Sequence, residues 1–223
     1  EAFSGCSALT TANFPLVTSI GNAFNGCSAL ETANFPLATS IGSMAFNGCS
    51  ALTTANFPKA TSICVYAFSG CKALTTADFP QATNIGNAFS GCSALTAANF
   101  PQATNIGVDA FIGCSALTTA NFPQATSIGN NAFSGCSALE TANFPQVTSI
   151  GYGAFSDTGG TALTITLPQT APAVSSVDTS SNSTDSKTVT ISTPADRTGY
   201  DPAWEADFKK AFGNRATITL EYQ

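Results

Sequence analysis

Apolar and polar residues alternate over short stretches of this chain, and the pattern recurs along most of its length. In the first stretch, LTTANF, the residues Leu9, Ala12 and Phe14 are apolar. The polar residues Thr11 and Asn13 flank Ala12, which is the alternation of a short strand with one buried face. A proline follows directly and ends the strand, because proline has no N–H to donate to a neighbouring strand.

A repeat of 21 or 22 residues organises the chain. Its clearest marker is the phenylalanine of an Ala-Phe pair, which occurs at Phe3, Phe24, Phe46, Phe68, Phe89, Phe111, Phe133 and Phe155. A unit of this length cannot bury its apolar face alone, so the units stack, and the sequence predicts a solenoid of about eight turns. We expect a mainly β fold with one parallel sheet of about eight short strands along one face.

The rest of each repeat predicts less regular backbone. A second extended segment, ATSI or VTSI, precedes a glycine in several repeats, and we expect that glycine to supply a turn with positive φ where one is needed. The segment AFSGC is too short for a full helix and predicts a single helical or 3-10 turn. The face opposite the sheet should therefore consist of short turns or 3-10 segments.

The repeats continue through the strand-like stretch TALTITLP and stop at Pro168. We expect a solenoid over residues 1–168 and a small α+β C-terminal cap over residues 169–223. The cap contains a polar, low-complexity loop at residues 175–187, in which an Asn-Ser-Thr sequon begins at Asn182.

Three regular elements are predicted within the cap. Strands at residues 188–192 and 216–222 flank a helix that Asp201 caps and Gly213 ends. The apolar side of this helix is formed by Trp204, Phe208, Ala211 and Phe212. Such a face at the end of a repeat array shields the last coil from water.

The opposite end of the array has no such cap. Phe3, Cys6 and Leu9 should lie on an open coil at the N-terminus. We expect either that upstream repeats cover this coil or that two chains meet there end to end. The chain also opens inside a repeat, and we expect its targeting signal to lie upstream.

Charge excludes one class of partner. Charged residues make up 9% of the chain, with 13 acidic and 7 basic side chains and a net charge of −6. A chain with so few basic residues lacks the electrostatic footprint of a nucleic-acid-binding protein. Every apolar run is shorter than the ~18 residues of a membrane span, so we expect no membrane insertion of this segment.

Seven of the eight cysteines hold one position in successive repeats, from Cys6 to Cys136. We interpret them as a ladder of buried thiols that act as small apolar side chains. A zinc site is not expected, because the chain has no histidine and no CxxC pair. Disulfides between coils fit a strand spacing of about 4.8 Å but are disfavoured, because stacked side chains point in parallel. Cys64 stands apart, in place of a turn glycine.

The repeat resembles the leucine-rich repeat of the BspA-like, or Treponema pallidum, type over about residues 1–168. In the second repeat and the start of the third the resemblance is carried by Leu30, Phe35, Pro36, Ile41, Gly42, Ala45, Phe46, Gly48 and Cys49. It implies a leucine-rich repeat solenoid in a secreted or surface-attached bacterial protein. It also implies attachment to a host matrix or cell-surface protein or to a glycan.

Two rows of polar side chains should point outward from the strands and form a nearly neutral face, suited to many weak contacts. This candidate binding face consists of Thr11, Asn13, Thr32, Asn34, Thr54, Asn56, Thr76, Asp78, Asn99, Thr119, Asn121, Thr141 and Asn143. The function that we expect is non-enzymatic adhesion or binding through this face. We predict no catalytic residue, metal or cofactor, since no histidine is present to form a relay with serine or cysteine.

Two other interpretations of the polar rows stay open. The chain could be a passive spacer or stalk within a larger surface protein, whose Thr and Asn side chains keep the sheet soluble and bond to one another. A regular Thr array could also match an ice lattice. We disfavour ice binding because leucine-rich repeat sheets bend, whereas a lattice match requires a flat face.

Overall fold

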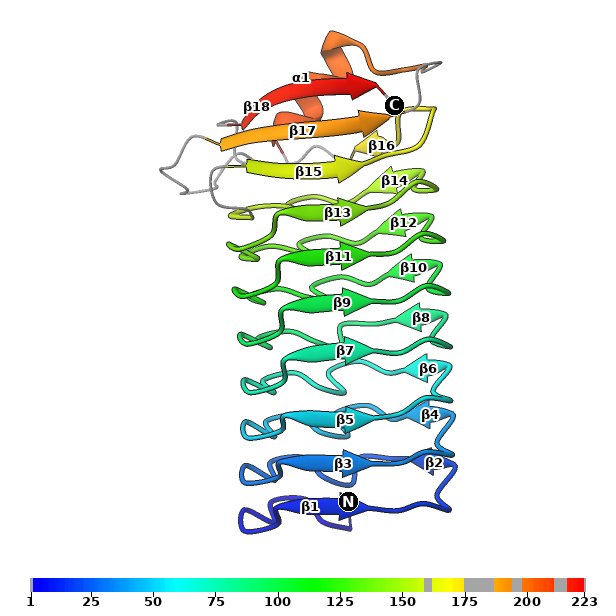
Figure 1. Cartoon of the computed structure of the whole chain (residues 1–223), viewed down its shortest axis with the longest axis vertical. Helices are drawn as coiled ribbons and strands as arrows, with labels where there is room; N and C mark the ends of the chain where they lie inside the picture. The colour runs from blue at the N-terminus through cyan, green and yellow to red at the C-terminus, as the bar shows by residue number, and fades with distance from the viewer. Residues whose placement is uncertain (1, 159–161, 175–186, 194–197, 211–215, 223) are drawn as a thin grey trace.

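A ladder of short parallel strands forms one side of the molecule, which we call the strand face (Figure 1). Its repeat strands are β1 (Thr11–Asn13), β3 (Thr32–Asn34), β5 (Thr54–Asn56), β7 (Thr76–Asp78), β9 (Ala97–Asn99), β11 (Thr119–Asn121) and β13 (Thr141–Asn143). Neighbouring strands pair in register, so that Thr11 lies beside Thr32 and Asn13 beside Asn34. The predicted solenoid and its parallel sheet are therefore confirmed.

The computed structural model describes residues 2–158, 162–174, 187–193, 198–210 and 216–222. The predicted loop at residues 175–187 lies almost wholly outside the described residues, and so does the sequon at Asn182.

The second side of the solenoid is more regular than we expected. It carries an eight-stranded parallel sheet, in place of irregular backbone. Its strands are β2 (Ser19–Ile20), β4 (Ser40–Ile41), β6 (Ser62–Ile63), β8 (Asn84–Ile85), β10 (Asn105–Ile106), β12 (Ser127–Ile128), β14 (Ser149–Ile150) and β16 (Ala173–Val174). The AFSGC segments form turns, and the described residues contain no 3-10 segment. Stacking in register lets even two residues per coil form a continuous ladder.

Our assignment of the left-handed turn to the glycine after the isoleucine was wrong. The glycine of AFSGC takes that conformation instead, with φ of 72° at Gly5 and 74° at Gly26. The glycine after the isoleucine serves close packing, since a Cβ on Gly42 would lie 2.7 Å from the carbonyl oxygen of Ile20. Contacts between coils therefore leave no room for a side chain at Gly42, Gly107, Gly129 and Gly151, whereas Gly21 and Gly86 have room for one and Cys64 carries one. The sequence of one repeat does not reveal this difference.

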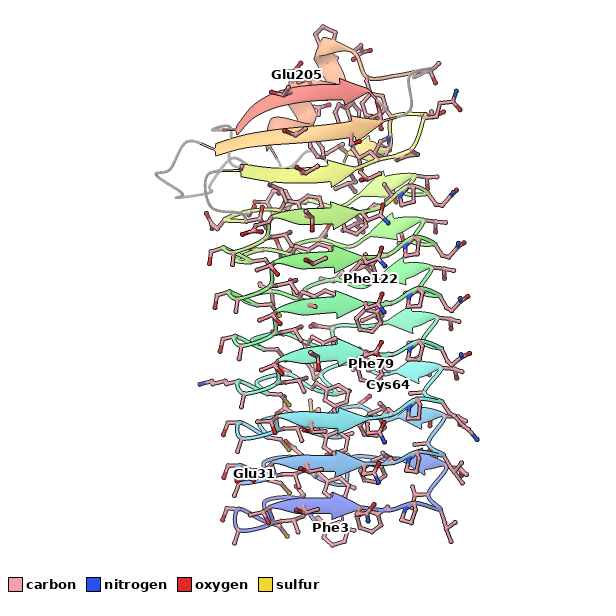
Figure 2. The ribbon with its side chains drawn as sticks, in the orientation of Figure 1. Phe3, Glu31, Cys64, Phe79, Phe122 and Glu205 are labelled. Carbon is pink, nitrogen blue, oxygen red and sulfur yellow. The ribbon has the colours of Figure 1, made fainter. Side chains whose placement is uncertain are left out.

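Two columns of phenylalanine rings fill the space between the sheets. The first column contains the Ala-Phe rings, whose centroids are 5.2 to 5.6 Å apart with interplanar angles of at most 8°. The second column consists of Phe14, Phe35, Phe57, Phe79, Phe100, Phe122 and Phe144. Rings of different columns meet edge to face, as at Phe24 and Phe35, with 5.7 Å between centroids and an angle of 67°. Figure 2 shows these side chains in layers that follow the coils.

The coils stack in one column, which does not bend within the plane of Figure 1. Most steps in the second phenylalanine column, 5.3 to 5.9 Å, are equal to or slightly longer than those in the first.

The C-terminal part continues both sheets and then covers the last coil. Strands β15 (Ala162–Thr166), β17 (Lys187–Thr193) and β18 (Ala216–Tyr222) extend the strand face, which confirms the strands predicted there. Helix α1 (Pro202–Lys210) begins after Asp201, whose Oδ1 accepts a hydrogen bond of 2.8 Å from the Trp204 N–H. The predicted positions Ala211, Phe212 and Gly213 lie outside the described residues.

Helix α1 closes the first phenylalanine column. Phe208 is fully buried, with its ring 6.5 Å from that of Phe155, and Trp204 stacks on Phe208 at 4.6 Å. The Trp204 indole N–H donates to the carbonyl oxygen of Pro172 at 2.7 Å, and the Tyr200 hydroxyl donates to that of Pro168 at 2.7 Å. These contacts give the C-terminal residues the shielding role that the sequence predicts for them.

Buried thiols form a third ladder, as we predicted. Six of the eight cysteines are buried and all eight are free, whereas Cys6 is exposed at the open end and Cys64 is half-buried. Each buried thiol donates to the carbonyl oxygen of the first-column phenylalanine in the preceding coil, for example Cys92 to Phe68 at 3.1 Å. Burial raises the pKa of these thiols, and it raises that of Cys49 and that of Cys114 to about 12.

The strand face is interrupted once, at a place that we call the seam. Strands β5 and β7 belong to separate sheets, and Figure 1 shows a wider space between them than between other neighbouring repeat strands. Among the described residues, Thr75 N–H has no backbone acceptor, whereas the equivalent N–H groups of Thr53 and Thr96 donate to the preceding coil at 3.0 and 2.9 Å. Phe57 and Phe79 are 6.2 Å apart, the longest step in either column.

The seam has a chemical cause in Asp78, which replaces the asparagine of the other repeats. In the ladder below the seam, Asn56 Nδ2 donates to Asn34 Oδ1 at 2.6 Å. An ionised aspartate has no N–H to donate to Asn56 Oδ1, so two acceptors face each other across the seam. The hydrogen bonds between these coils at the second sheet are intact; for example, the Thr83 N–H donates to the carbonyl oxygen of Thr61 at 3.1 Å.

An asparagine in place of Asp78 should restore the pairing between β5 and β7. We expect Asp78→Asn to raise the free energy of unfolding by about 1 to 3 kcal/mol, because it adds one side-chain hydrogen bond and lets neighbouring backbone groups pair. Urea unfolding measures this change. Asp109→Asn removes the same charge away from the strand face and should have little effect, and an equal gain in both variants would assign the effect to net charge.

Alkaline pH should destabilise the fold through the buried thiols. Their pKa lies above the ordinary value of 9.0 in the folded chain, so above that pH the unfolded state loses protons that the folded state keeps. Each such thiol should cost about 1.4 kcal/mol of stability per pH unit above its ordinary pKa. Urea unfolding under reducing conditions tests this, and the pH dependence of Cys92→Ala should be weaker by one proton. Identical slopes would contradict the prediction.

Candidate functional site

All thirteen residues of the predicted binding face lie on the strand face, and none of them is buried. The alanine between the two rows points inward and is buried in six of the seven repeat strands, as Ala120 is in β11. The alternation in the sequence therefore places the threonine and asparagine rows correctly. The seam divides both rows between β5 and β7, which the sequence analysis did not anticipate.

The asparagine row is a directional chain of hydrogen bonds. Each side-chain N–H donates toward the N-terminus, as Asn34 does to Asn13 at 2.8 Å and Asn143 does to Asn121 at 2.9 Å. Above the seam, the contact of Asn99 with Asp78 is longer, at 3.5 Å. Within each run the amides are thus bonded to one another, which fixes their orientation and leaves a second lone pair and N–H on each.

The ends of the two runs carry oxygen atoms that are open to a partner. Among the described residues, no donor reaches Asn56 Oδ1 or Asn143 Oδ1. The first atom faces Asp78 across the seam. The second lies beside β15, where Thr166 takes the place that an asparagine would occupy. At these two positions the strand face presents an amide oxygen that no ladder bond uses.

A shallow hollow of about 210 Å³ surrounds the end of the second run. Its floor contains the buried Ala120 and Ala142, and its walls are formed by Thr119, Asn121, Thr141, Asn143, Thr164 and Thr166. The hollow forms because a threonine side chain at β15 is shorter than the asparagine that continues the row elsewhere. It combines an apolar floor with polar walls, the composition of a small recognition site.

Thr164 and Thr166 are the members of this hollow that the sequence analysis missed. They lie in TALTITLP, where the Thr-Ala-Asn motif of the repeats is replaced. The strand register could have found them, because pairing Ala142 with Ile165 places Thr164 beside Thr141 and Thr166 beside Asn143.

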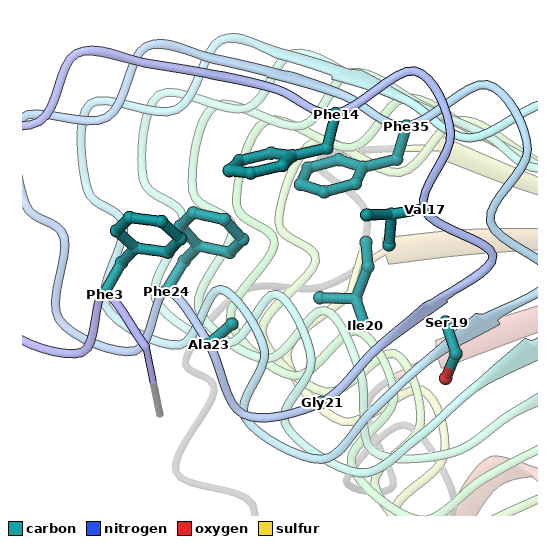
Figure 3. A pocket seen from close by; sticks show the side chains of 9 residues that line it. All are labelled: Phe3, Phe14, Val17, Ser19, Ile20, Gly21, Ala23, Phe24 and Phe35. Carbon is teal, nitrogen blue, oxygen red and sulfur yellow. The ribbon is translucent and has the colours of Figure 1, made fainter.

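The open N-terminal coil forms a second hollow, of about 130 Å³. Figure 3 shows Phe3 in front of Phe24 and Phe14 in front of Phe35, with Val17 beside them. The two front rings are only half-buried, in contrast to most of the rings behind them. The first coil therefore presents an apolar end surface.

Within the described ranges, no three His, Cys, Asp or Glu side chains are grouped so that they could hold a metal ion. No helix in the same part of the chain is long and apolar enough to cross a bilayer.

Two solved structures of bacterial leucine-rich proteins are similar to this chain. The chain is similar to a leucine-rich cell surface protein from Faecalibacterium prausnitzii A2-165, with 22% identity over 96% of this chain and 79% of the other and a TM-score of 0.42. It is also similar to a leucine-rich repeat protein from Bacteroides ovatus ATCC 8483, with 18% identity over 95% and 69% of the two chains and a TM-score of 0.48. No curated protein matches the chain.

The repeats themselves identify the family. The sequence profile of the BspA type leucine-rich repeat region matches residues 1–88 and 83–184, in six copies. The matched ranges contain the repeat strands of both sheets and the two phenylalanine columns. The chain therefore belongs to the BspA-type leucine-rich repeat family.

Proposed function

We propose that this chain is a non-enzymatic binding module of a secreted or cell-surface bacterial protein, and that its strand face holds a host matrix protein, a cell-surface protein or a glycan. The observation that carries the proposal is the hollow over β11, β13 and β15, where Asn143 presents an open acceptor beside buried alanines. BspA-type repeats are typical of surface proteins, which supports the location.

The chemistry of the strand face favours recognition by hydrogen bonds over recognition by charge. Asp78 is the one ionisable residue among the thirteen that were predicted for this face. Uncharged Thr and Asn side chains give individually weak contacts, and affinity then comes from their repetition along the coils. Burial raises the pKa of the thiols inside the solenoid, and a buried, protonated thiol is a poor nucleophile.

A passive spacer is the second candidate, and one observation favours it. Most of the asparagine amides are bonded to their own neighbours, which is what a sheet needs for stability without any partner. A spacer would accept any soluble substitution in the hollow, whereas a receptor would not. The two candidates therefore differ in how they respond to a bulky side chain at Thr164.

The test measures binding of the chain to a panel of purified matrix proteins and an array of cell-surface glycans. Thr164 is exposed and its side chain forms no hydrogen bond to a described residue, so Thr164→Arg should fill the hollow and keep the fold. We expect it to weaken binding at least about tenfold, the loss of one well-placed contact region.

Ser149→Arg is the matched control, because it places the same side chain on the exposed surface of the second sheet. It should bind as the native chain does. Equal loss in both variants would contradict a site on the strand face, and no binding to any member of the panel would favour the spacer. Thermal hysteresis measured on the same sample tests ice binding, and a value equal to that of buffer excludes it.

A further inference from the structure

One loop near the C-terminal end of the solenoid is a residue longer than its equivalents (Figure 1). In every coil from β1 to β14, the loop from the strand face to the second sheet has five residues, as at 144–148. Between β15 and β16 it has six, at 167–172. The strands on both sides of this loop still pair with the preceding coil, so the extra residue must be accommodated within the loop.

A groove lies between this longer loop and the loop of the preceding coil, and we call it the corner groove. Its volume is about 780 Å³, larger than that of either hollow described above. Sites for small molecules typically measure roughly 300 to 1,000 Å³. The residues that form its two walls and its apolar lining include Pro145, Gln146, Val147, Pro168, Gln169 and Ala171.

The C-terminal cap holds the longer loop in place. The Tyr200 hydroxyl and the Trp204 indole N–H each donate to a proline carbonyl oxygen of the loop, both at 2.7 Å. The Ala171 N–H donates to the carbonyl oxygen of Thr198 at 2.8 Å. None of these three cap residues lines the groove. The loop is therefore fixed by contacts outside the groove, and the groove is formed before a ligand binds.

Two glutamine amides of the corner groove are free to bind a ligand. Gln146 and Gln169 belong to opposite walls and are exposed, and neither side chain forms a hydrogen bond to a described residue. The asparagine row of the strand face differs, because most of its amides bond to one another, as Asn143 does to Asn121. Each glutamine can therefore offer an N–H and a carbonyl oxygen without the loss of a bond within the fold.

The lining of the groove favours a neutral ligand that both donates and accepts hydrogen bonds. None of the described residues that line it is ionisable, so a phosphate, sulfate or carboxylate group would find no charged partner there. Neighbouring hydroxyl groups of a sugar suit an amide, since each hydroxyl donates and accepts. The apolar side chains of Pro145, Val147 and Pro168 can contact the C–H face of a sugar ring.

A peptide fits the corner groove less well than a sugar. Extended peptides commonly add to an open sheet edge or dock as a polyproline helix into an aromatic groove. The corner groove offers no open edge, because β13 pairs with β15 and β14 with β16 on either side of it. No aromatic side chain is among the described residues that line it.

We propose that the corner groove binds a short neutral saccharide, and that Gln146 and Gln169 donate and accept its hydrogen bonds from the two walls. This site is separate from the function proposed above, because the groove shares no lining residue with the hollow on the strand face. The extra residue of the loop at 167–172 creates the site, and the cap that covers the last coil also fixes it.

An array of neutral oligosaccharides, printed beside sialylated and sulfated counterparts, tests the proposal with the native chain. We expect binding to neutral members and weaker binding to their charged counterparts. Gln146→Ala and Gln169→Ala should each weaken binding about five- to tenfold, through the loss of hydrogen bonds to the sugar. The urea midpoint should stay unchanged in both variants, because these side chains are exposed and unbonded in the free chain.

Gln102→Ala is the matched control. Gln102 follows the equivalent proline two coils before Gln146 and is also exposed, but it does not line the groove. This variant should bind the saccharide as the native chain does. Thr164→Arg on the strand face should also keep saccharide binding, so the two proposals can fail separately.

Several results would overturn the corner groove as a saccharide site. An equal loss in Gln102→Ala and Gln169→Ala would place the binding elsewhere, and so would a loss confined to Thr164→Arg, which would instead support the function proposed above. A preference for sialylated or sulfated members would contradict the neutral ligand. If no saccharide binds, and a random peptide library yields ligands that Gln169→Ala weakens, the groove is a peptide site.

Discussion

Ring stacking between successive coils is the constraint on which the rest of this structure depends. A phenylalanine in each coil must lie directly over the phenylalanine of the coil before, with centroids 5.2 to 5.6 Å apart in the first column. A second column, tilted against the first, prevents the coils from sliding. Because both columns keep nearly one spacing, the coils stay parallel, and every outward residue is placed in a row with its equivalents.

Rows of hydrogen-bonded side chains then determine whether the strands of neighbouring coils pair. An amide side chain both donates and accepts a hydrogen bond, so each asparagine in a row can bond to the asparagines before and after it. Each buried thiol also donates a hydrogen bond to a carbonyl oxygen of the preceding coil. Asp78 shows the effect of a single change in this row. Its carboxylate is an acceptor where the other repeats have an amide donor, and this replacement coincides with the loss of pairing between β5 and β7. The turns and the second sheet of the same coils remain bonded.

Much of this architecture could be predicted from the sequence. The period of the Ala-Phe pairs predicts the length and number of the coils, and the alternation around Ala12 predicts the position of the strands. The apolar side of the helix after Asp201 predicts that it packs on the last coil. These features depend on local pattern. The glycines that exclude a side chain, the seam and the second sheet depend on contacts between coils, which one repeat does not show.

The candidate sites illustrate the same limit. The predicted rows do lie on the strand face, but the open acceptor at Asn143 depends on Thr166 in the following strand. The repeats also differ at Met44 and Tyr66, two bulky residues that adopt positive φ, and the shared pattern of the repeats does not predict them.

Amide hydrogen exchange of Thr53, Thr75 and Thr96 in the native chain tests the central claim, that the strand face pairs from coil to coil and is interrupted between β5 and β7. These residues hold one position in three successive coils, and the N–H groups of Thr53 and Thr96 are bonded to the preceding coil. We predict slow exchange at both and markedly faster exchange at Thr75. Protection of Thr75 equal to that of the other two would contradict the account.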